Sequence, residues 1–268
     1  MEHLREYAAQ PLSRFLEYWE DSRRLLEVSM TGMSALKDIA VVLEQVRLFV
    51  AKIGLGSPNT SQKDLLSNLQ KAERDAAYSQ KEIDAGFPLL HAHTLVGAWG
   101  ALEAAIEDML VGILLNEPRH LQDPSLGKIR IPLAEFEALE KEDRMRLLIE
   151  EIRRNNPSGR KNGNVTFESL LERFLLSGPV NADISRDIWE ANQVRNVIVH
   201  RNSIADRHLV KSCPWMKMNI GDKVIITSQQ IDRYGHALCE YVATILRRLE
   251  VRYGVDPTPK RLASHNNT

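Results

Sequence analysis

Apolar residues recur at three- and four-residue intervals along most of this 268-residue chain. This spacing places them on one side of a helix, so it predicts amphipathic α-helices and an all-α fold. Segments rich in Gly, Pro and Asn separate the helices, and Pro11 interrupts the first helix near its start. The expected helices cover residues 2–30, 34–53, 61–84, 89–116, 134–154, 166–177, 184–201 and 228–253.

One short stretch departs from helical spacing. Residues 223–227 (KVIIT) are rich in β-branched side chains and follow a Gly-Asp pair, which is typical of a strand. Residues 216–220 would be the partner strand across a tight turn, so we expect at most one short β-hairpin. Asp183 and Ser228 are the expected N-caps of the last two helices.

The pattern also suggests how the chain is divided. Residues 1–85 form an N-terminal helical extension, in which the sparse apolar stripe of residues 61–84 suggests an arm that faces a partner. Residues 86–256 form the main helical domain. Residues 257–268 are polar and form a disordered tail.

Composition excludes several classes of protein. With 35 basic and 36 acidic residues, the chain has no overall basic bias, so nucleic-acid binding would need a local patch. Cys213 and Cys239 fit neither a disulfide framework nor a metal-ligand spacing, which indicates free thiols in a reducing compartment. The apolar stretch 94–115 contains Glu103 and other acidic residues, which are costly in hydrocarbon. We therefore expect a cytoplasmic protein that does not engage a membrane.

Candidate chemistry lies in residues 192–202, with the sequence NQVRNVIVHRN. On a helix, Asn192, Asn196 and His200 are spaced four apart and share a face. Arg195 lies about 140° round the axis from His200, and its long side chain reaches toward that face. A polar set within an apolar helical run is hard to explain by packing alone.

These residue types suit phosphodiester cleavage without a metal. An imidazole can accept the proton of an RNA 2′-hydroxyl or protonate the leaving 5′-oxygen. A guanidinium offsets the charge that develops on phosphorane oxygens, and an amide orients the groups. No carboxylate cluster or Cys/His ligand set lies beside the motif, so we expect neither a metal nor another cofactor.

The motif resembles that of the HEPN superfamily, which is Arg-x(4–6)-His, often with Asn directly after the arginine. Here it stands as Arg195-Asn196-Val-Ile-Val-His200-Arg201-Asn202. Members often place an aromatic and an acidic residue on the preceding long helix, which matches residues 95–110 (LVGAWGALEAAIEDML). The segment from residue 221 onward is also similar, so the resemblance spans residues 86–253.

The resemblance implies a HEPN-like antiparallel helical bundle and a metal-independent endoribonuclease, acting as a toxin or an anti-phage defence effector. Arg195 would bind the scissile phosphate, His200 would transfer protons and Asn196 would orient one of them. Two copies would form one composite cleft as a homodimer, which binds RNA and an antitoxin or other defence partner. Glu103 would pair with Arg195 or fix the histidine tautomer, with Asn192 and Arg201 in supporting roles.

Other interpretations stay open. A histidine near a helix end often only interacts with the helix dipole, and Glu103 is equally a charge on a solvated edge. The chain would then be a non-catalytic dimerisation, nucleotide-sensing or partner-binding module. We interpret His91 and His93 as surface or capping residues, and Trp99 and Trp189 as core or dimer-interface aromatics.

Overall fold

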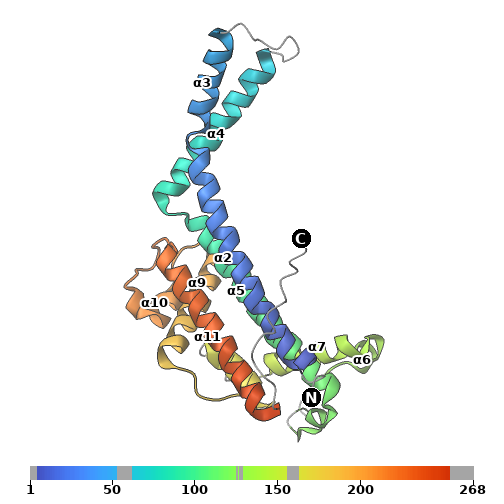
Figure 1. Cartoon of the computed structure of the whole chain (residues 1–268). Helices are drawn as coiled ribbons and strands as arrows, with labels where there is room; N and C mark the ends of the chain where they lie inside the picture. The colour runs from blue at the N-terminus through green and yellow to red at the C-terminus, as the bar shows by residue number, and fades with distance from the viewer. Residues whose placement is uncertain (1–4, 53–61, 125, 127–128, 156–162, 254–268) are drawn as a thin grey trace. The chain divides into compact units, whose positions relative to one another are not determined.

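The computed structural model describes residues 5–52, 62–124, 126, 129–155 and 163–253 (Figure 1). This part of the chain is all-α, as the apolar spacing predicts, and it contains no strand. None of its helices is long and apolar enough to cross a membrane. The predicted disordered tail at residues 257–268 lies outside the described residues. The helical elements are η1 (Arg5–Ala9), α2 (Gln10–Leu36), α3 (Ile39–Lys52), α4 (Gln62–Ala85), α5 (Pro88–Asn116), η2 (Pro118–Gln122), α6 (Leu133–Ala138), α7 (Lys141–Arg154), α8 (Gly163–Glu172), α9 (Ala182–Arg201), α10 (Arg207–Ser212), η5 (Pro214–Met216) and α11 (Ser228–Tyr253).

The predicted hairpin does not form. The backbone of residues 221–224 bonds instead to residues 203–205, with Ala205 N–H donating to Asp222 O at 2.8 Å and Val224 N–H to Ser203 O at 2.7 Å. These bonds leave one isolated bridge, between Ile204 and Lys223. The prediction failed because the bonding partner of residues 223–227 comes from the end of α9, and hydrophobic alternation carries no information on that pairing.

The residues that cap two helices at their N-termini also differ from the expected ones. The side chain of Asn181, rather than that of Asp183, caps α9 by accepting from the backbone N–H groups of Asp183 and Ile184. Thr227, rather than Ser228, caps α11: its hydroxyl accepts from Gln230 N–H, and the Gln230 side chain accepts from Thr227 N–H. This reciprocal pair is a capping box.

The expected helix over residues 134–154 is two helices. Leu139, between α6 and α7, has extended backbone angles (φ −89°, ψ 151°), so the helical path is broken there. Arg144 Nε donates to the Leu139 carbonyl at 2.8 Å, which satisfies a backbone group that the break exposes.

The described chain divides into two compact units. The described residues of the larger unit fall within 1–20, 95–224 and 232–268, and those of the smaller unit within 21–94 and 225–231. Residues 8–15 group with the larger unit because Ala8, Leu12 and Phe15 are buried. This grouping differs from a boundary at residue 85, and a separate role for residues 1–85 stays a prediction.

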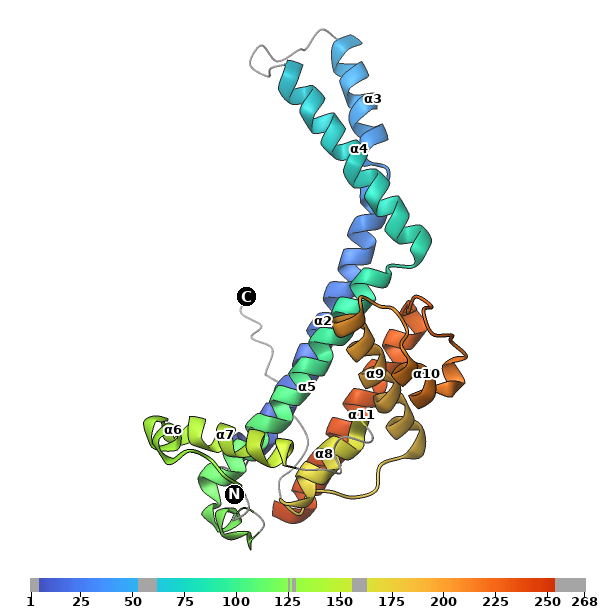
Figure 2. The same ribbon diagram turned by 180° about the vertical axis from the view of Figure 1, so that it is seen from behind.

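Close packing in the larger unit depends on two glycines. A Cβ atom on Gly112 of α5 would lie 2.4 Å from the carbonyl oxygen of Tyr7, which is too close for any side chain. A Cβ atom on Gly235 of α11 would lie 1.7 Å from the ring of Trp19. Gly112 therefore allows the backbone of η1 to approach α5, whereas a side chain at position 235 would have to displace the Trp19 ring of α2 from α11 (Figures 1 and 2).

In the smaller unit, the segment before α11 is held by a buried histidine. His91, near the start of α5, is fully buried, and its Nδ1 atom lies 2.9 Å from the carbonyl oxygen of Ile226. The Ser228 hydroxyl lies 3.5 Å from its Nε2 atom. The interpretation of His91 as a surface or capping residue was wrong, because a contact distant in sequence buries it.

Candidate functional site

Helix α9 carries the motif, and its buried stripe sets the direction in which the motif faces. Ile188, Ala191, Val194 and Val197 are buried and recur at three-residue intervals. Asn202 then adopts a left-handed conformation (φ 51°, ψ 42°), which ends the helix directly after Arg201. The motif side chains therefore lie on the flank of a helix whose other side is fixed in the core.

A buried carboxylate fixes α9 to α11 and η5. Glu190 is 2% exposed and accepts hydrogen bonds from Arg233, the Tyr234 hydroxyl and the Trp215 indole. Burial alone would raise the pKa of Glu190, but these three donors outweigh it and hold the pKa below its usual value. The burial of Glu190 could have been predicted from its spacing in the sequence. It lies four and seven residues before Val194 and Val197, which are buried on the same side of α9.

Arg195 is the most constrained residue of the motif. Its side chain is 24% exposed, its Nη1 atom donates to Asn196 Oδ1 at 3.1 Å, and its Nη2 atom lies 3.7 Å from Glu103 Oε2. Its Nε atom is buried, and among the described residues it has no hydrogen-bond partner. A guanidinium has five N–H donors, so Arg195 keeps donors that no described group uses.

The structure brings Arg195, Asn196 and Glu103 together and leaves His200 apart from them. His200 lies in the last turn of α9, is exposed, and makes no hydrogen bond or ion pair with any described residue. Asn192 is partly buried, two turns before His200 on the same face. Arg201 is exposed, with Nε 3.6 Å from Asp206 Oδ2. Within one chain, the imidazole and the guanidinium are not linked by a hydrogen bond.

Apolar side chains flank the exposed histidine. Val199 precedes it and is 47% exposed, and Ile204 follows in the turn after α9 and is 42% exposed. Two exposed aliphatic side chains therefore lie within four residues of His200 in the sequence.

The aromatic and cysteine residues near the motif have structural environments. Trp99 on α5 is buried, and Trp189 on α9 donates through Nε1 to the Ser212 carbonyl at 3.0 Å. Cys213 and Cys239 are free thiols, as expected. Burial raises the pKa of Cys213 to about 12 and that of Cys239 to about 11, so both thiols stay protonated near neutral pH.

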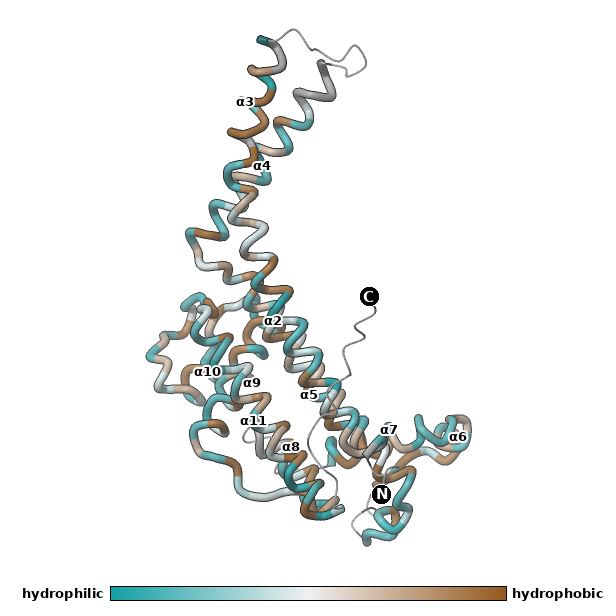
Figure 3. Tube along the Cα trace, in the orientation of Figure 1, coloured by the Kyte–Doolittle hydropathy of each residue, from teal (hydrophilic) through white to brown (hydrophobic). Residues whose placement is uncertain are grey.

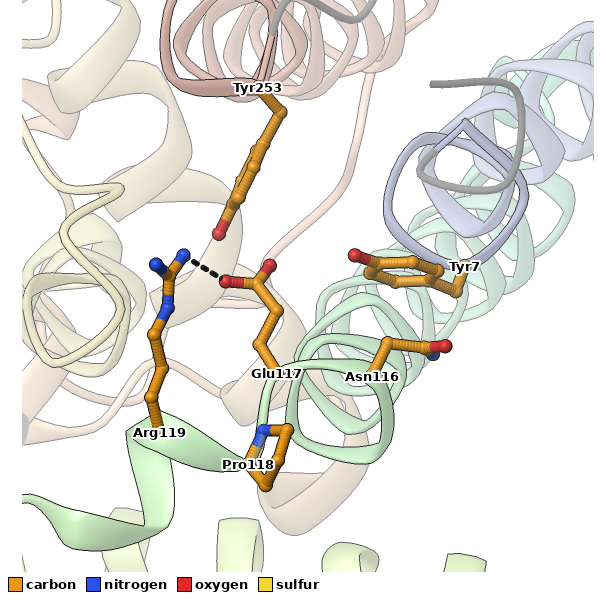
Figure 4. A pocket seen from close by; sticks show the side chains of 6 residues that line it. All are labelled: Tyr7, Asn116, Glu117, Pro118, Arg119 and Tyr253. Atoms are coloured by element: carbon orange, nitrogen blue, oxygen red, sulfur yellow. Dashed lines mark hydrogen bonds and ion pairs between the residues drawn. The ribbon is translucent and has the colours of Figure 1, made fainter.

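A surface cavity of about 470 Å³ lies at the other end of α5 (Figure 4). Glu117 pairs with Arg119 at its edge, and burial is the main cause that raises the pKa of Tyr7 beside them. Asn116 also lines the cavity, and it lies roughly 20 Å along the helix from Glu103. No motif residue lines this cavity, and none of its lining residues was a candidate site residue in the sequence.

Among the described residues, no group of three or more His, Cys, Asp or Glu side chains is arranged to hold a metal ion. Comparison with known proteins gives no match to a family model, a curated protein or a solved structure.

Proposed function

We propose that the protein is a metal-independent endoribonuclease of HEPN type, with Arg195, Asn196 and His200 at its active site. The observation that carries the proposal is the arrangement around Arg195. Its guanidinium is oriented by Asn196 and Glu103, it keeps unused donors, and an exposed imidazole follows on the same helix. An oriented cation beside a free acid–base group is what cleavage of a phosphodiester requires.

In the proposed reaction, the 2′-hydroxyl oxygen of RNA attacks the adjacent phosphorus, and the bond to the 5′-oxygen breaks. A neutral His200 accepts the 2′-hydroxyl proton, and a protonated His200 from a second copy gives a proton to the leaving 5′-oxygen. Arg195 binds the non-bridging oxygens, on which negative charge increases in the transition state. The products are a 2′,3′-cyclic phosphate and a 5′-hydroxyl.

This scheme needs two copies, because each chain supplies one His200. The exposed Val199 and Ile204 support a two-fold contact near the end of α9, since their burial would favour pairing there. Opposed α9 helices would place two imidazoles at one composite cleft. Glu103 and Asn192 would then line the cleft, with Arg201 at its edge.

Metal-free RNA cleavage by a helical protein suits a toxin or an anti-phage defence effector that acts in the cytoplasm. Such a protein would need an antitoxin or another defence protein to restrain it. These finer proposals rest on the motif resemblance and not on a contact in this structure.

The proposal is tested by incubating the purified protein with cellular RNA in EDTA, alongside His200→Ala. The matched control is His208→Ala, because His208 is also exposed but lies on α10, outside the motif. Cleavage that resists EDTA, persists in His208→Ala and is lost in His200→Ala supports the proposal. RNA that is bound but left intact would favour the non-catalytic alternative.

A further inference from the structure

Helix α3 has the composition of a buried helix but is exposed. Its sequence is IAVVLEQVRLFVAK, and Figure 3 shows it as largely hydrophobic. A helix that is apolar almost all round is normally enclosed by protein or lipid. Yet seven large apolar side chains of α3 are 36–61% exposed: Ile39, Val41, Val42, Leu43, Val46, Leu48 and Phe49.

Within the smaller unit, α4 packs along one side of α3 (Figures 1 and 2). Of the described side chains of α3, Glu44 alone is partly buried, so a carboxylate is covered while the apolar groups are not. Ile39, Val42, Val46 and Phe49 lie about 140–160° round the axis from Glu44. The most apolar side of α3 therefore faces away from its most covered residue.

The spacing of these four residues is that of a coiled-coil seam. They are separated by three, four and three residues, which corresponds to heptad positions a, d, a and d. The four seam side chains, which are 36–61% exposed, together offer on the order of 400 Å² per copy. Two such seams would bury about 800 Å², which is the size of a weak, reversible protein–protein contact.

We propose that α3 is a self-association surface, on which α3 of a second copy packs antiparallel about a two-fold axis. We align the two helices so that Ile39 lies against the second copy's Phe49 and Val42 lies against its Val46. This alignment is the register of the proposed pair. All four seam residues then pair a against d, the arrangement that an antiparallel coiled coil requires. The two-fold axis repeats each contact.

The charges at the ends of the seam match the same register. Asp38 precedes α3 and Lys52 ends it, both are exposed, and neither has an ion-pair partner among the described residues. Glu44 and Arg47, by contrast, already pair with each other at 2.6 Å. Antiparallel packing brings Asp38 of each copy beside Lys52 of the other, whereas parallel packing separates these charges. This complementarity favours a second copy over an unrelated partner.

The surface shares no residue with the motif, and its proposed role is independent of the proposed ribonuclease activity. Its test is the association of the full-length chain, measured by sedimentation equilibrium and compared between Val46→Lys and Leu48→Lys. Both residues are exposed on α3, at 52% and 57%, but only Val46 lies in the seam. We expect Val46→Lys to weaken the α3-dependent association step at least tenfold while pairing through α9 persists, and Leu48→Lys to change that step less than about twofold.

A charge exchange tests the register. Asp38→Lys and Lys52→Asp should each weaken association, and the double variant should restore it, because the opposite charges meet again. Circular dichroism checks that every variant keeps its helix content. Equal effects of Val46→Lys and Leu48→Lys, an unaffected Val46→Lys protein, or a double variant no stronger than the single ones would overturn the proposal. RNA cleavage by the same variants is scored separately, so loss of one property is distinguished from loss of the other.

Discussion

The Nη2 atom of Arg195 lies 3.7 Å from Oε2 of Glu103, so the guanidinium on α9 faces a carboxylate on α5. Pairing with Arg195 was one of the roles that the sequence left open for Glu103, and the two charged groups lie within ion-pair distance. The distance is too long for a hydrogen bond, and within the described part of the chain the guanidinium of Arg195 donates its hydrogen bond to its neighbour Asn196. Glu103 therefore balances the charge of Arg195 without consuming its donors.

Glu103→Gln should lower the rate of RNA cleavage by about tenfold and change the free energy of unfolding by less than about 1 kcal/mol. Both partners are partly solvated, so the pair adds little stability. The rate falls because Arg195 loses the group that directs it. The measurement is single-turnover cleavage with urea unfolding in parallel. Glu107→Gln is the control, because Glu107 lies one turn further along α5 and faces Arg146. Equal rates for Glu103→Gln and wild type would argue against a role for the pair.

Removal of the motif side chains should separate activity from stability. His200→Ala should abolish cleavage and change the free energy of unfolding by less than about 0.5 kcal/mol, because the side chain is exposed and unpaired among the described residues. Arg195→Ala should also abolish cleavage but cost about 1 kcal/mol, since its stem is partly buried. Asn196→Ala should retain some activity because it only orients Arg195. A sharply destabilised His200→Ala protein that still cleaves RNA would show that the histidine is structural.

Glu190→Gln should reduce stability in a pH-dependent way. The pKa of Glu190 is lowered in the folded protein, so its carboxylate stabilises the fold above the unfolded-state value near 4.3, and this contribution is lost as the pH falls through the folded-state value. At pH 7 the substitution should cost on the order of 2–3 kcal/mol, because Arg233 loses a buried partner.

Below about pH 4 the difference between Glu190→Gln and wild type should shrink. Urea unfolding at several pH values measures it, with Glu172→Gln as the control because Glu172 is exposed. A difference that stays constant from pH 7 to pH 3 would contradict the assigned role of the Glu190 carboxylate.

The spacing of apolar residues predicted those features of the structure that depend on residues close together in the sequence. Apolar spacing predicted the all-α fold and nearly the correct limits of α5 and α9, because a helix buries one side at a fixed period. The same period places Asn192, Asn196 and His200 on one face. Contacts distant in sequence were not predictable: the pairing of residues 203–205 with 221–224 replaced the hairpin, and the Ile226 carbonyl buried His91.

In the candidate site, one contact could be anticipated from the sequence and another could not. The approach of Glu103 to Arg195 was one of the alternatives that the sequence offered, because an acidic residue on the preceding helix is part of the motif resemblance. The anchoring of α9 by Glu190 was not, because a lone glutamate gives no sign of the three donors that reach it from α11 and η5. The N-cap of α9 was also predicted at the wrong residue. Asn181 and Asp183 are both residue types that cap helices, and only the backbone geometry decides which of them does so.

The central claim is that His200 and Arg195 cleave RNA through its own 2′-hydroxyl. The most direct measurement is analysis of the product ends from a defined single-stranded RNA, cleaved in EDTA, beside a substrate with one 2′-deoxy residue at the cleavage position. We expect 2′,3′-cyclic phosphate and 5′-hydroxyl ends, and an intact deoxy-substituted substrate, because deoxyribose lacks the nucleophile. Products with 5′-phosphate ends, cleavage of the deoxy-substituted substrate, or activity that appears only with added magnesium would contradict the claim.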